Sequence, residues 1–275
     1  MIQDIVVNLT VGSPHDPARD YAVSAAKTFE AELFGVAFCY DPIIIAGAIE
    51  AMPADFIEVQ RNENAKAAKE AIAKFKQAAE KVGISTEAQM IEASLTGAPN
   101  AFGRIARVYD LSIANQSEPG KSAPESLIVE AALFESGRPV IVVPYIQKDS
   151  FKLDHVMVCW DGSRTAARAL ADAMPLLEFA KAVEVVTVAI GHNKDDGNLG
   201  ADVSQHLARH GLKAVTKRIV ADADVTSTLL SHAADSSADF IVMGGYGHSR
   251  LREFFLGGVT RGILGAMTVP VLMSH

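Results

Sequence analysis

Short apolar runs alternate with helical patterns along the chain, and the same order occurs twice. In the first half, strand patterns lie at 5–9, 35–39, 86–91, 111–115 and 139–143, and helical patterns at 18–33, 57–82, 99–108 and 126–134. After a polar linker at 147–150, strand patterns return at 155–160, 183–190, 214–220, 240–243 and 269–273, with helical patterns at 164–179, 198–210 and 225–234 and a short one before the last strand. This alternation predicts parallel sheets with right-handed crossovers and helices on both faces.

The repeat is visible in the residues themselves. Arg138–Val143 reads Arg-Pro-Val-Ile-Val-Val, and Val269–Met273 reads Val-Pro-Val-Leu-Met. Residues 109–114 and 238–243 likewise share an aspartate in front of an apolar strand. We therefore predict an α/β fold with two tandem doubly wound domains, 1–146 and 152–275. Each would contain a five-stranded, mainly parallel sheet, and pseudo-two-fold symmetry would relate the two.

Composition narrows the functional classes. The chain has 275 residues, 49% hydrophobic, which supplies apolar side chains for two cores. The net charge of −8 shows no excess of Lys and Arg of the kind that nucleic-acid-binding proteins use to contact phosphates. Cys39 and Cys159 lie in apolar runs and suit a reducing compartment better than a structural disulfide. The apolar run 43–52 is interrupted by Glu50 and is shorter than the ~20 residues of a membrane span. We expect a cytoplasmic protein without a nucleic-acid or membrane partner, and the first residues lack a leader pattern.

The strand pattern at 240–243 ends in a glycine-rich segment. Its glycines cluster on both sides of a nine-residue stretch, at Gly244, Gly245, Gly247, Gly257 and Gly258. Glycine lets the backbone approach a ligand closely, and the start of a helix presents free N–H groups to an anion. Ligands of open α/β sheets bind beyond the carboxyl ends of the strands. The segment therefore predicts a site for a phosphate-bearing ligand.

The spacing Gly244-x-x-Gly247, nine residues and Gly257 resembles the nucleotide-binding signature of the universal stress protein family. In that signature a Ser or Thr follows the last glycine, and here Gly258 stands in its place. A lost hydrogen bond costs about 1 kcal/mol, and up to ~3 kcal/mol when it involves a charged group. The departure thus predicts weakened rather than abolished binding, and Thr260 offers a hydroxyl two residues further on.

The resemblance implies an adenine nucleotide alpha hydrolase-like fold that binds ATP, with Mg²⁺ arriving on the phosphates. It implies adenine contacts at the first two strand ends of the second half, at Cys159, Trp160, Asp161 and Ile190. It implies phosphate contacts at Gly244, Gly247, Gly257, Gly258 and Val259. Met243, His248 and Thr260 lie beside these residues in the sequence and are further candidate nucleotide-binding residues. Because related single domains pair through their last strands, it also implies pairing of 139–143 with 269–273. Such a protein would pass nucleotide status to a protein partner or form a homodimer.

The residues that follow the first strand of the second half carry their own signal. Asp161, Gly162 and Ser163 place a carboxylate, a turn glycine and a helix N-cap at a strand end, which suits ribose or base contacts. The alternative is that Asp161 or Ser163 only caps the next helix. Trp160 suits either an adenine pocket or the core. The cations Arg250 and Arg252, beyond His248, suit either phosphate or solvent.

The first half lacks these features. Its first strand ends in Asn8-Leu9-Thr10 without an aspartate, and no Gly-x-x-Gly follows its fourth strand. Glu118 would repel phosphate there. We predict that this half binds no nucleotide in the family manner, and that its apolar insert at 42–56 covers a groove or binds something else.

Two other functions stay open. One is a structural or interaction protein that has lost nucleotide binding through Gly258. The other is a metal-dependent hydrolase, because His206 and His210 lie four residues apart on a helical pattern. Asp195, Asp196, Asp222 and Asp224 are more typical of loop and cap positions than of Mg²⁺ ligands. No Gly-x-Ser-x-Gly elbow occurs, and the glycine segment at 244–258 contains no Gly-Lys-Ser/Thr, so we assign no catalytic residue and expect at most slow ATP hydrolysis.

Overall fold

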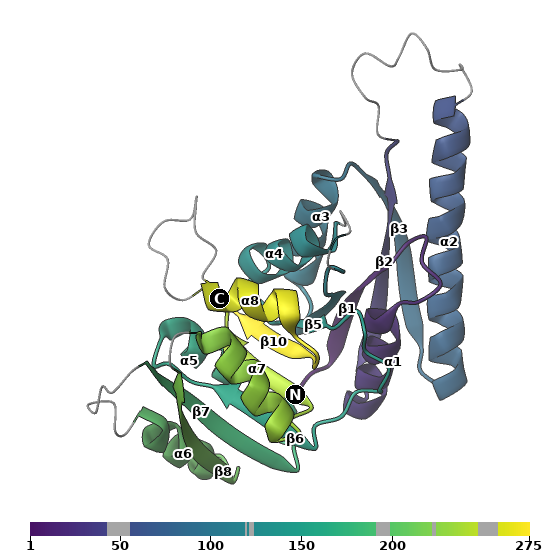
Figure 1. The fold of residues 1–275 in the computed structure, drawn as a ribbon. Helices are drawn as coiled ribbons and strands as arrows, with labels where there is room; N and C mark the ends of the chain where they lie inside the picture. The colour runs from purple at the N-terminus through teal and green to yellow at the C-terminus, as the bar shows by residue number, and fades with distance from the viewer. Residues whose placement is uncertain (43–55, 119, 121–123, 191–198, 222–223, 247–257) are drawn as a thin grey trace.

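A computed structural model describes residues 1–42, 56–118, 120, 124–190, 199–221, 224–246 and 258–275 (Figure 1). The strands and helices of the first half are β1 (Asp4–Leu9), α1 (Pro17–Phe29), β2 (Glu32–Tyr40), α2 (Phe56–Val82), β3 (Thr86–Ala93), α3 (Gly97–Ala106), β4 (Leu111–Asn115), α4 (Glu125–Glu135) and β5 (Val140–Val143). Those of the second half are β6 (His155–Cys159), α5 (Arg164–Leu177), β7 (Ala182–Ile190), α6 (Leu199–Arg209), β8 (Ala214–Ala221), α7 (Val225–Asp235), β9 (Phe240–Gly244), α8 (Gly258–Ala266) and β10 (Val271–Ser274).

The ten strands found in the described residues join one sheet, in the order β3-β2-β1-β4-β5-β10-β9-β6-β7-β8. Read outward from the middle, the second half repeats the order of the first, which is consistent with the predicted pseudo-two-fold relation. Neighbouring strands within each half are parallel. The two halves meet at β5 and β10, which are antiparallel, with Ile141 opposite Leu272. The predicted α/β fold and the predicted pairing of the last strands are both confirmed.

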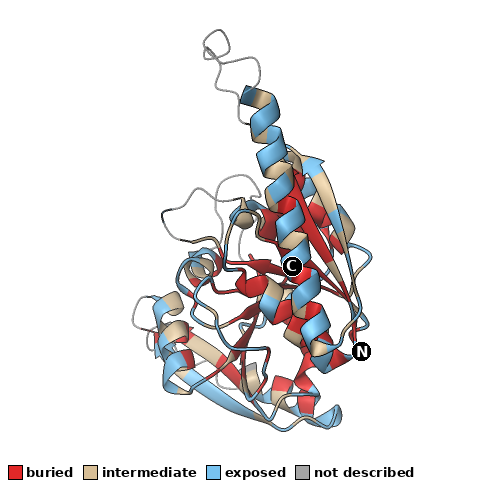
Figure 2. Cartoon of the chain, turned by 90° about the vertical axis from the view of Figure 1, so that its right-hand side faces the viewer, coloured by how far each residue is buried: buried red, intermediate tan, exposed pale blue. Residues whose placement is uncertain are grey.

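Helices cover both faces of this sheet, because the strand side chains alternate between two cores. In β10, Leu272 enters the core that α1, α2, α5 and α6 cover, whereas Val271 and Met273 enter the core of α3, α4, α7 and α8. Both cores contain residues from both halves of the chain. Figure 2 shows the buried sheet behind the long helix α2, whose outer side is exposed.

The segment between the halves is partly built into the core. Residues 147–150 are polar and mostly exposed, as the predicted linker requires, but Phe151 is buried. The Phe151 ring lies 5.1 Å from that of Phe29 and 6.3 Å from that of Phe240, measured between centroids. This residue therefore ties α1 of the first half to β9 of the second. The domain limits 1–146 and 152–275 remain a prediction.

The predicted helix at 18–33 is shorter in the structure, so that part of the prediction is wrong. Asp16 caps α1 by accepting a hydrogen bond from the Arg19 N–H, and Pro17 begins the helix. The helix ends at Phe29 because Glu30 turns into the left-handed region, with φ 54°. Leu33 continues the apolar periodicity by coincidence, since it is buried in β2 opposite Ile5.

Among the described helices, none combines the length and apolar character needed to cross a membrane.

Candidate functional site

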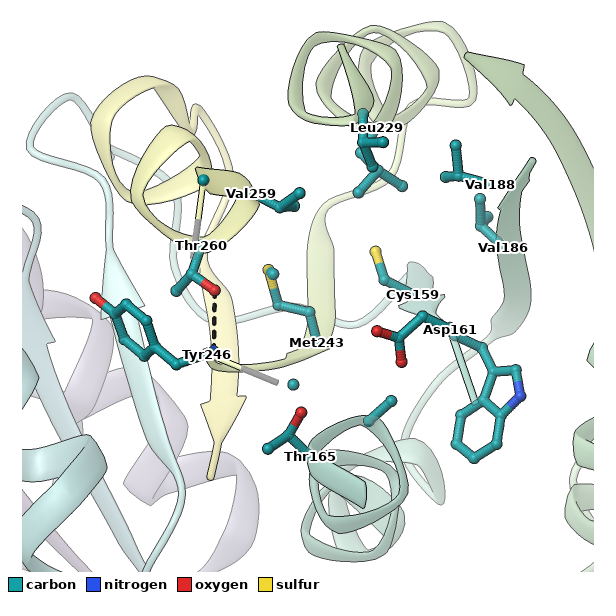
Figure 3. A pocket seen from close by; sticks show the side chains of 15 residues that line it. Cys159, Asp161, Thr165, Val186, Val188, Leu229, Met243, Tyr246, Val259 and Thr260 are labelled. Carbon is teal, nitrogen blue, oxygen red and sulfur yellow. Dashed lines mark hydrogen bonds between the residues drawn. The ribbon is translucent and has the colours of Figure 1, made fainter. Parts of the chain in front are cut away.

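A cavity of about 330 Å³ opens beyond the carboxyl ends of β6 and β9 (Figure 3). After β6 the chain passes through α5 to β7, and after β9 it passes through α8 to β10, in the opposite direction along the sheet. Because α5 and α8 cover opposite faces, the cavity lies at a topological switch point of the sheet. It is lined by Cys159, Trp160, Asp161, Thr165, Ala166, Val186, Val188, Val225, Leu229, Met243, Gly244, Tyr246, Gly258, Val259 and Thr260. The structure therefore brings together eight of the predicted site residues: Cys159, Trp160, Asp161, Met243, Gly244, Gly258, Val259 and Thr260.

Three helices begin at this cavity, and two of them are capped by their own side chains. Ser163 Oγ accepts a hydrogen bond from the Ala166 N–H of α5 at 3.1 Å. Asp224 accepts hydrogen bonds from the N–H groups of Thr226 and Ser227 of α7 at 3.1 Å each. The residue before α8 is glycine, which has no side chain to act as a cap. The positive end of α8 is thus the one best suited to an anion from outside the chain.

Gly258 begins α8, and no other described residue crowds it. A Cβ built on Gly258 would meet none of the described atoms within 4 Å, and its φ is not positive. The residue is also exposed. Nothing in the described structure therefore requires glycine at the position where the family signature has a hydroxyl residue.

Thr260 fastens α8 to the end of β9. Its side chain is buried, and its Oγ1 accepts a hydrogen bond from the Tyr246 N–H at 3.1 Å (Figure 3). Tyr246 has a left-handed backbone, with φ 55°, and its ring packs against Phe134 of α4. The predicted hydroxyl therefore lies in the cavity wall, where it holds the turn that leads out of the strand.

Gly244 is needed for packing within the protein. A Cβ at this position would approach the backbone N of Ala166 and the backbone C of Thr165 at 2.5 Å each. Side-chain carbons do not approach backbone this closely, so any larger residue would push α5 away from β9. The close approach that the sequence predicted for a ligand is made here by the first turn of α5.

Asp161 supplies a carboxylate at the edge of the cavity. Its Oδ1 accepts a hydrogen bond from the Ser163 N–H at 2.9 Å, and Gly162 turns the chain between them with φ 75°. In Figure 3 the Asp161 carboxylate points toward the middle of the cavity. Gly162 and Ser163 support this loop but do not line the cavity. Ser163 caps α5, as the alternative interpretation of this segment predicted.

The opposite walls are apolar, and no motif in the sequence marks their residues as part of a site. Val186 and Val188 come from β7, where alternate residues share a face, and Leu229 comes from α7 (Figure 3). Met243 of β9 lies between these walls and the turn. Such a surface offers a flat aromatic ring a place away from water.

Cys159 and Trp160 complete the side of the cavity next to Asp161. Burial raises the pKa of the Cys159 thiol to about 12, and the Asp161 carboxylate adds to this shift. The thiol is therefore protonated at neutral pH and is a poor nucleophile or metal ligand. Trp160 is half-buried against the core that α1 and α5 cover, and its backbone N–H donates to the Val186 carbonyl at 2.8 Å.

Several predicted residues lie outside the described part of the chain. These are the phosphate candidates Gly247, His248 and Gly257, the cations Arg250 and Arg252, the acidic residues Asp195, Asp196 and Asp222, and the insert at 43–55. Ile190 ends β7, but its side chain is not described either.

The candidate metal ligands His206 and His210 lie on and just after α6, with ring centroids 4.7 Å apart. The described residues contain no group of three His, Cys, Asp or Glu side chains that could hold a metal ion. Asp224, another candidate, is the N-cap of α7. The described geometry therefore offers no support for a metal-dependent hydrolase.

Comparison with known proteins supports the fold and indicates the family of the second half. The model of the universal stress protein family matches residues 152–275. The second half of this chain is a universal stress protein domain. The universal stress protein Slr1230 of Synechocystis is 26% identical over 145 residues, which are 49% of this chain and 46% of that protein. The match thus spans about half the length of this curated relative.

Two solved structures resemble the universal stress protein domain together with the first half. A universal stress protein from Archaeoglobus fulgidus is 16% identical, covers 98% of this chain and 97% of its own, and has a TM-score of 0.71. A putative universal stress protein from Pseudomonas aeruginosa is 12% identical, covers 99% of this chain and 93% of its own, and has a TM-score of 0.66. At these identities the likeness shows a shared fold over nearly the whole chain.

Proposed function

We propose that this universal stress protein binds an adenine nucleotide in the cavity of its second half, with ATP as the first candidate. The observation that carries the proposal is the combination of three surfaces around one space. An apolar slot, a carboxylate and the N-terminus of α8, which a glycine precedes in the sequence, face the same cavity. Those surfaces match, in order, a purine ring, a ribose and a chain of phosphates.

Each part of the nucleotide has a partner of suitable chemistry. The base would pack between the β7 valines and Leu229, where burial of its ring gains hydrophobic free energy. The ribose hydroxyls would donate to Asp161, because a carboxylate is a strong acceptor. The phosphates would accept hydrogen bonds from the first N–H groups of α8, near Gly258.

The described chemistry suits binding rather than catalysis. Asp161 is the one carboxylate among the described lining residues, and the Cys159 thiol is protonated at neutral pH. A carboxylate close to a triphosphate favours Mg²⁺ as a counterion, and that ion usually keeps several waters. We therefore propose a binding module for the stress response, with slow hydrolysis at most, whose nucleotide state is sensed by a protein partner or a second copy.

Isothermal titration with ATP–Mg²⁺ and with its 2′,3′-dideoxy analogue tests the proposal. The wild-type protein should bind ATP about tenfold more tightly than the analogue, because the analogue cannot donate to Asp161. Asp161→Asn should remove this difference, while its amide oxygen still accepts from the Ser163 N–H. Asp172→Asn, which breaks the α5 ion pair with Arg168 outside the cavity, is the matched control.

Equal affinities for ATP and the analogue in the wild-type protein would refute the ribose assignment. No heat at about 5 mM ATP, a concentration that detects even weak binding, would refute the nucleotide function. That second result would instead favour a protein that acts through interactions alone.

A further inference from the structure

A second cavity, of about 550 Å³, lies at the matching place in the first half. The sheet order sets β1 and β2 where the second half has β6 and β7. Its described lining residues are Asn8, Leu9, Thr10, Val11, Tyr40, Asp41, Pro42, Phe56, Gln60, Asn64, Leu95, Pro124 and Glu125. The absence of the glycine signature from this half predicted that it binds no nucleotide in the family manner, yet the structure keeps a larger cavity there.

Asn8 supplies a buried hydrogen-bond acceptor in this cavity wall. Its side chain is 5% exposed, and its Oδ1 accepts no hydrogen bond from the residues that the structure describes. An unsatisfied buried acceptor costs about 1–3 kcal/mol, so it is uncommon in a folded protein. A ligand that donates a hydrogen bond would remove this cost.

Glu125, the first residue of α4, presents a second acceptor of this kind. Its Oε2 is buried and has no hydrogen-bond partner within the described part of the chain. Burial raises the pKa of Glu125, and the charge of Asp16 adds to the effect. Asp41 supplies another carboxyl group to the lining, which includes no Lys or Arg among its described residues. This charge pattern repels phosphates and attracts a cation.

Aromatic and aliphatic surfaces surround these acceptors. Tyr40 and Phe56 line the cavity together with Leu9, Val11 and Leu95. Tyr40 lies near enough to Glu125 that this carboxylate, after burial, contributes to the raised pKa of its phenol. Asn64 of α2 donates to the Tyr40 carbonyl at 2.8 Å, which joins the helix to the end of β2. Aromatic faces beside carboxylates suit ammonium groups, which interact favourably with both.

We propose that the cavity of the first half binds a small organic cation: a protonated amine with an apolar body. The ammonium group would donate to Glu125 and Asn8, and the apolar body would lie against Tyr40 and Phe56. This site is separate from the nucleotide site and stands whether or not ATP binds in the second half.

Three probes with a common phenyl group distinguish the possibilities: 2-phenylethylamine, 2-phenylethanol and phenylacetate. Titration of the full chain at neutral pH should show binding of the amine at about 1 mM or tighter. The alcohol should bind at least about tenfold more weakly, and phenylacetate more weakly still, because only the amine carries a positive charge.

Glu125→Gln should weaken amine binding about tenfold or more and leave alcohol binding nearly unchanged. Glu130→Gln, the same change on the same helix but outside this cavity, should leave both unchanged. Circular dichroism would verify that each variant is folded, and Asp41→Asn gives a second test that should weaken amine binding less. The proposal is overturned if the amine fails to bind at about 10 mM, if phenylacetate binds as well, or if neither carboxylate substitution weakens the amine.

Discussion

Replacing Gly258 by serine should tighten ATP binding, because it places a hydroxyl at the first position of α8. The described structure leaves room for the side chain, with no atom within 4 Å of a Cβ and no positive φ to strain it. A hydrogen bond to a charged group contributes about 1.5–3 kcal/mol. Gly258 is exposed at the mouth of the cavity, which lowers the gain to about 1–2 kcal/mol. We therefore expect Gly258→Ser to bind ATP about five- to thirtyfold more tightly.

Gly258→Ala is the matched control, because it adds the same carbon without the hydroxyl. Both substitutions should stabilise α8 by some tenths of a kcal/mol to about 1 kcal/mol over glycine, so only the serine variant should gain affinity. Isothermal titration of all three proteins with ATP–Mg²⁺ measures the difference. If serine and alanine have the same effect, or if serine weakens binding, α8 does not receive the phosphates.

Three further predictions follow from the fold. Gly244→Ala should lower the free energy of unfolding by about 3 kcal/mol, since its Cβ would lie 2.5 Å from the α5 backbone. An unchanged free energy of unfolding in urea denaturation would contradict this packing. Burial holds the pKa of Asp16 above its usual 3.8, so its ionised form is disfavoured in the folded state. The stability of the wild type relative to Asp16→Asn should therefore rise as the pH falls from neutral toward 3.8, and should level off below pH 3.8. Denaturation across this pH range would contradict the prediction if the relative stability fell instead. A chain of residues 152–275 alone should dimerise, because the β10 edge loses its partner β5, and light scattering that shows a monomer would disagree.

The sequence carried most of the fold because its signals were local or repeated. Alternating strand and helix patterns indicated a parallel sheet, and the similar runs at 138–143 and 269–273 indicated two related halves. The end of α1 escaped prediction because Glu30 adopts a left-handed turn that glycine usually marks. The burial of Phe151 likewise could not be predicted, because nothing in the sequence indicates that a residue just after a polar linker enters the core.

The sequence predicted those residues of the candidate site that can be recognised from their neighbours in the chain. It missed those that reach the cavity only through the packing of separate elements. Asp161 and Gly258 could be identified from their neighbours in the chain. Val186 and Leu229 belong to ordinary strand and helix patterns, and only the arrangement of β7 and α7 turns them toward the cavity. The acceptors in the cavity of the first half were missed for the same reason, because Asn8 and Glu125 lie 117 positions apart in the chain and line one cavity only in the fold.

A crystal structure of the protein with ATP–Mg²⁺ would test the central proposal most directly. We predict density for the base beside Val186 and Leu229, for the ribose beside Asp161, and for the phosphates at the first turn of α8. Density for the nucleotide elsewhere on the chain, or a cavity without nucleotide at a saturating ATP concentration, would contradict it.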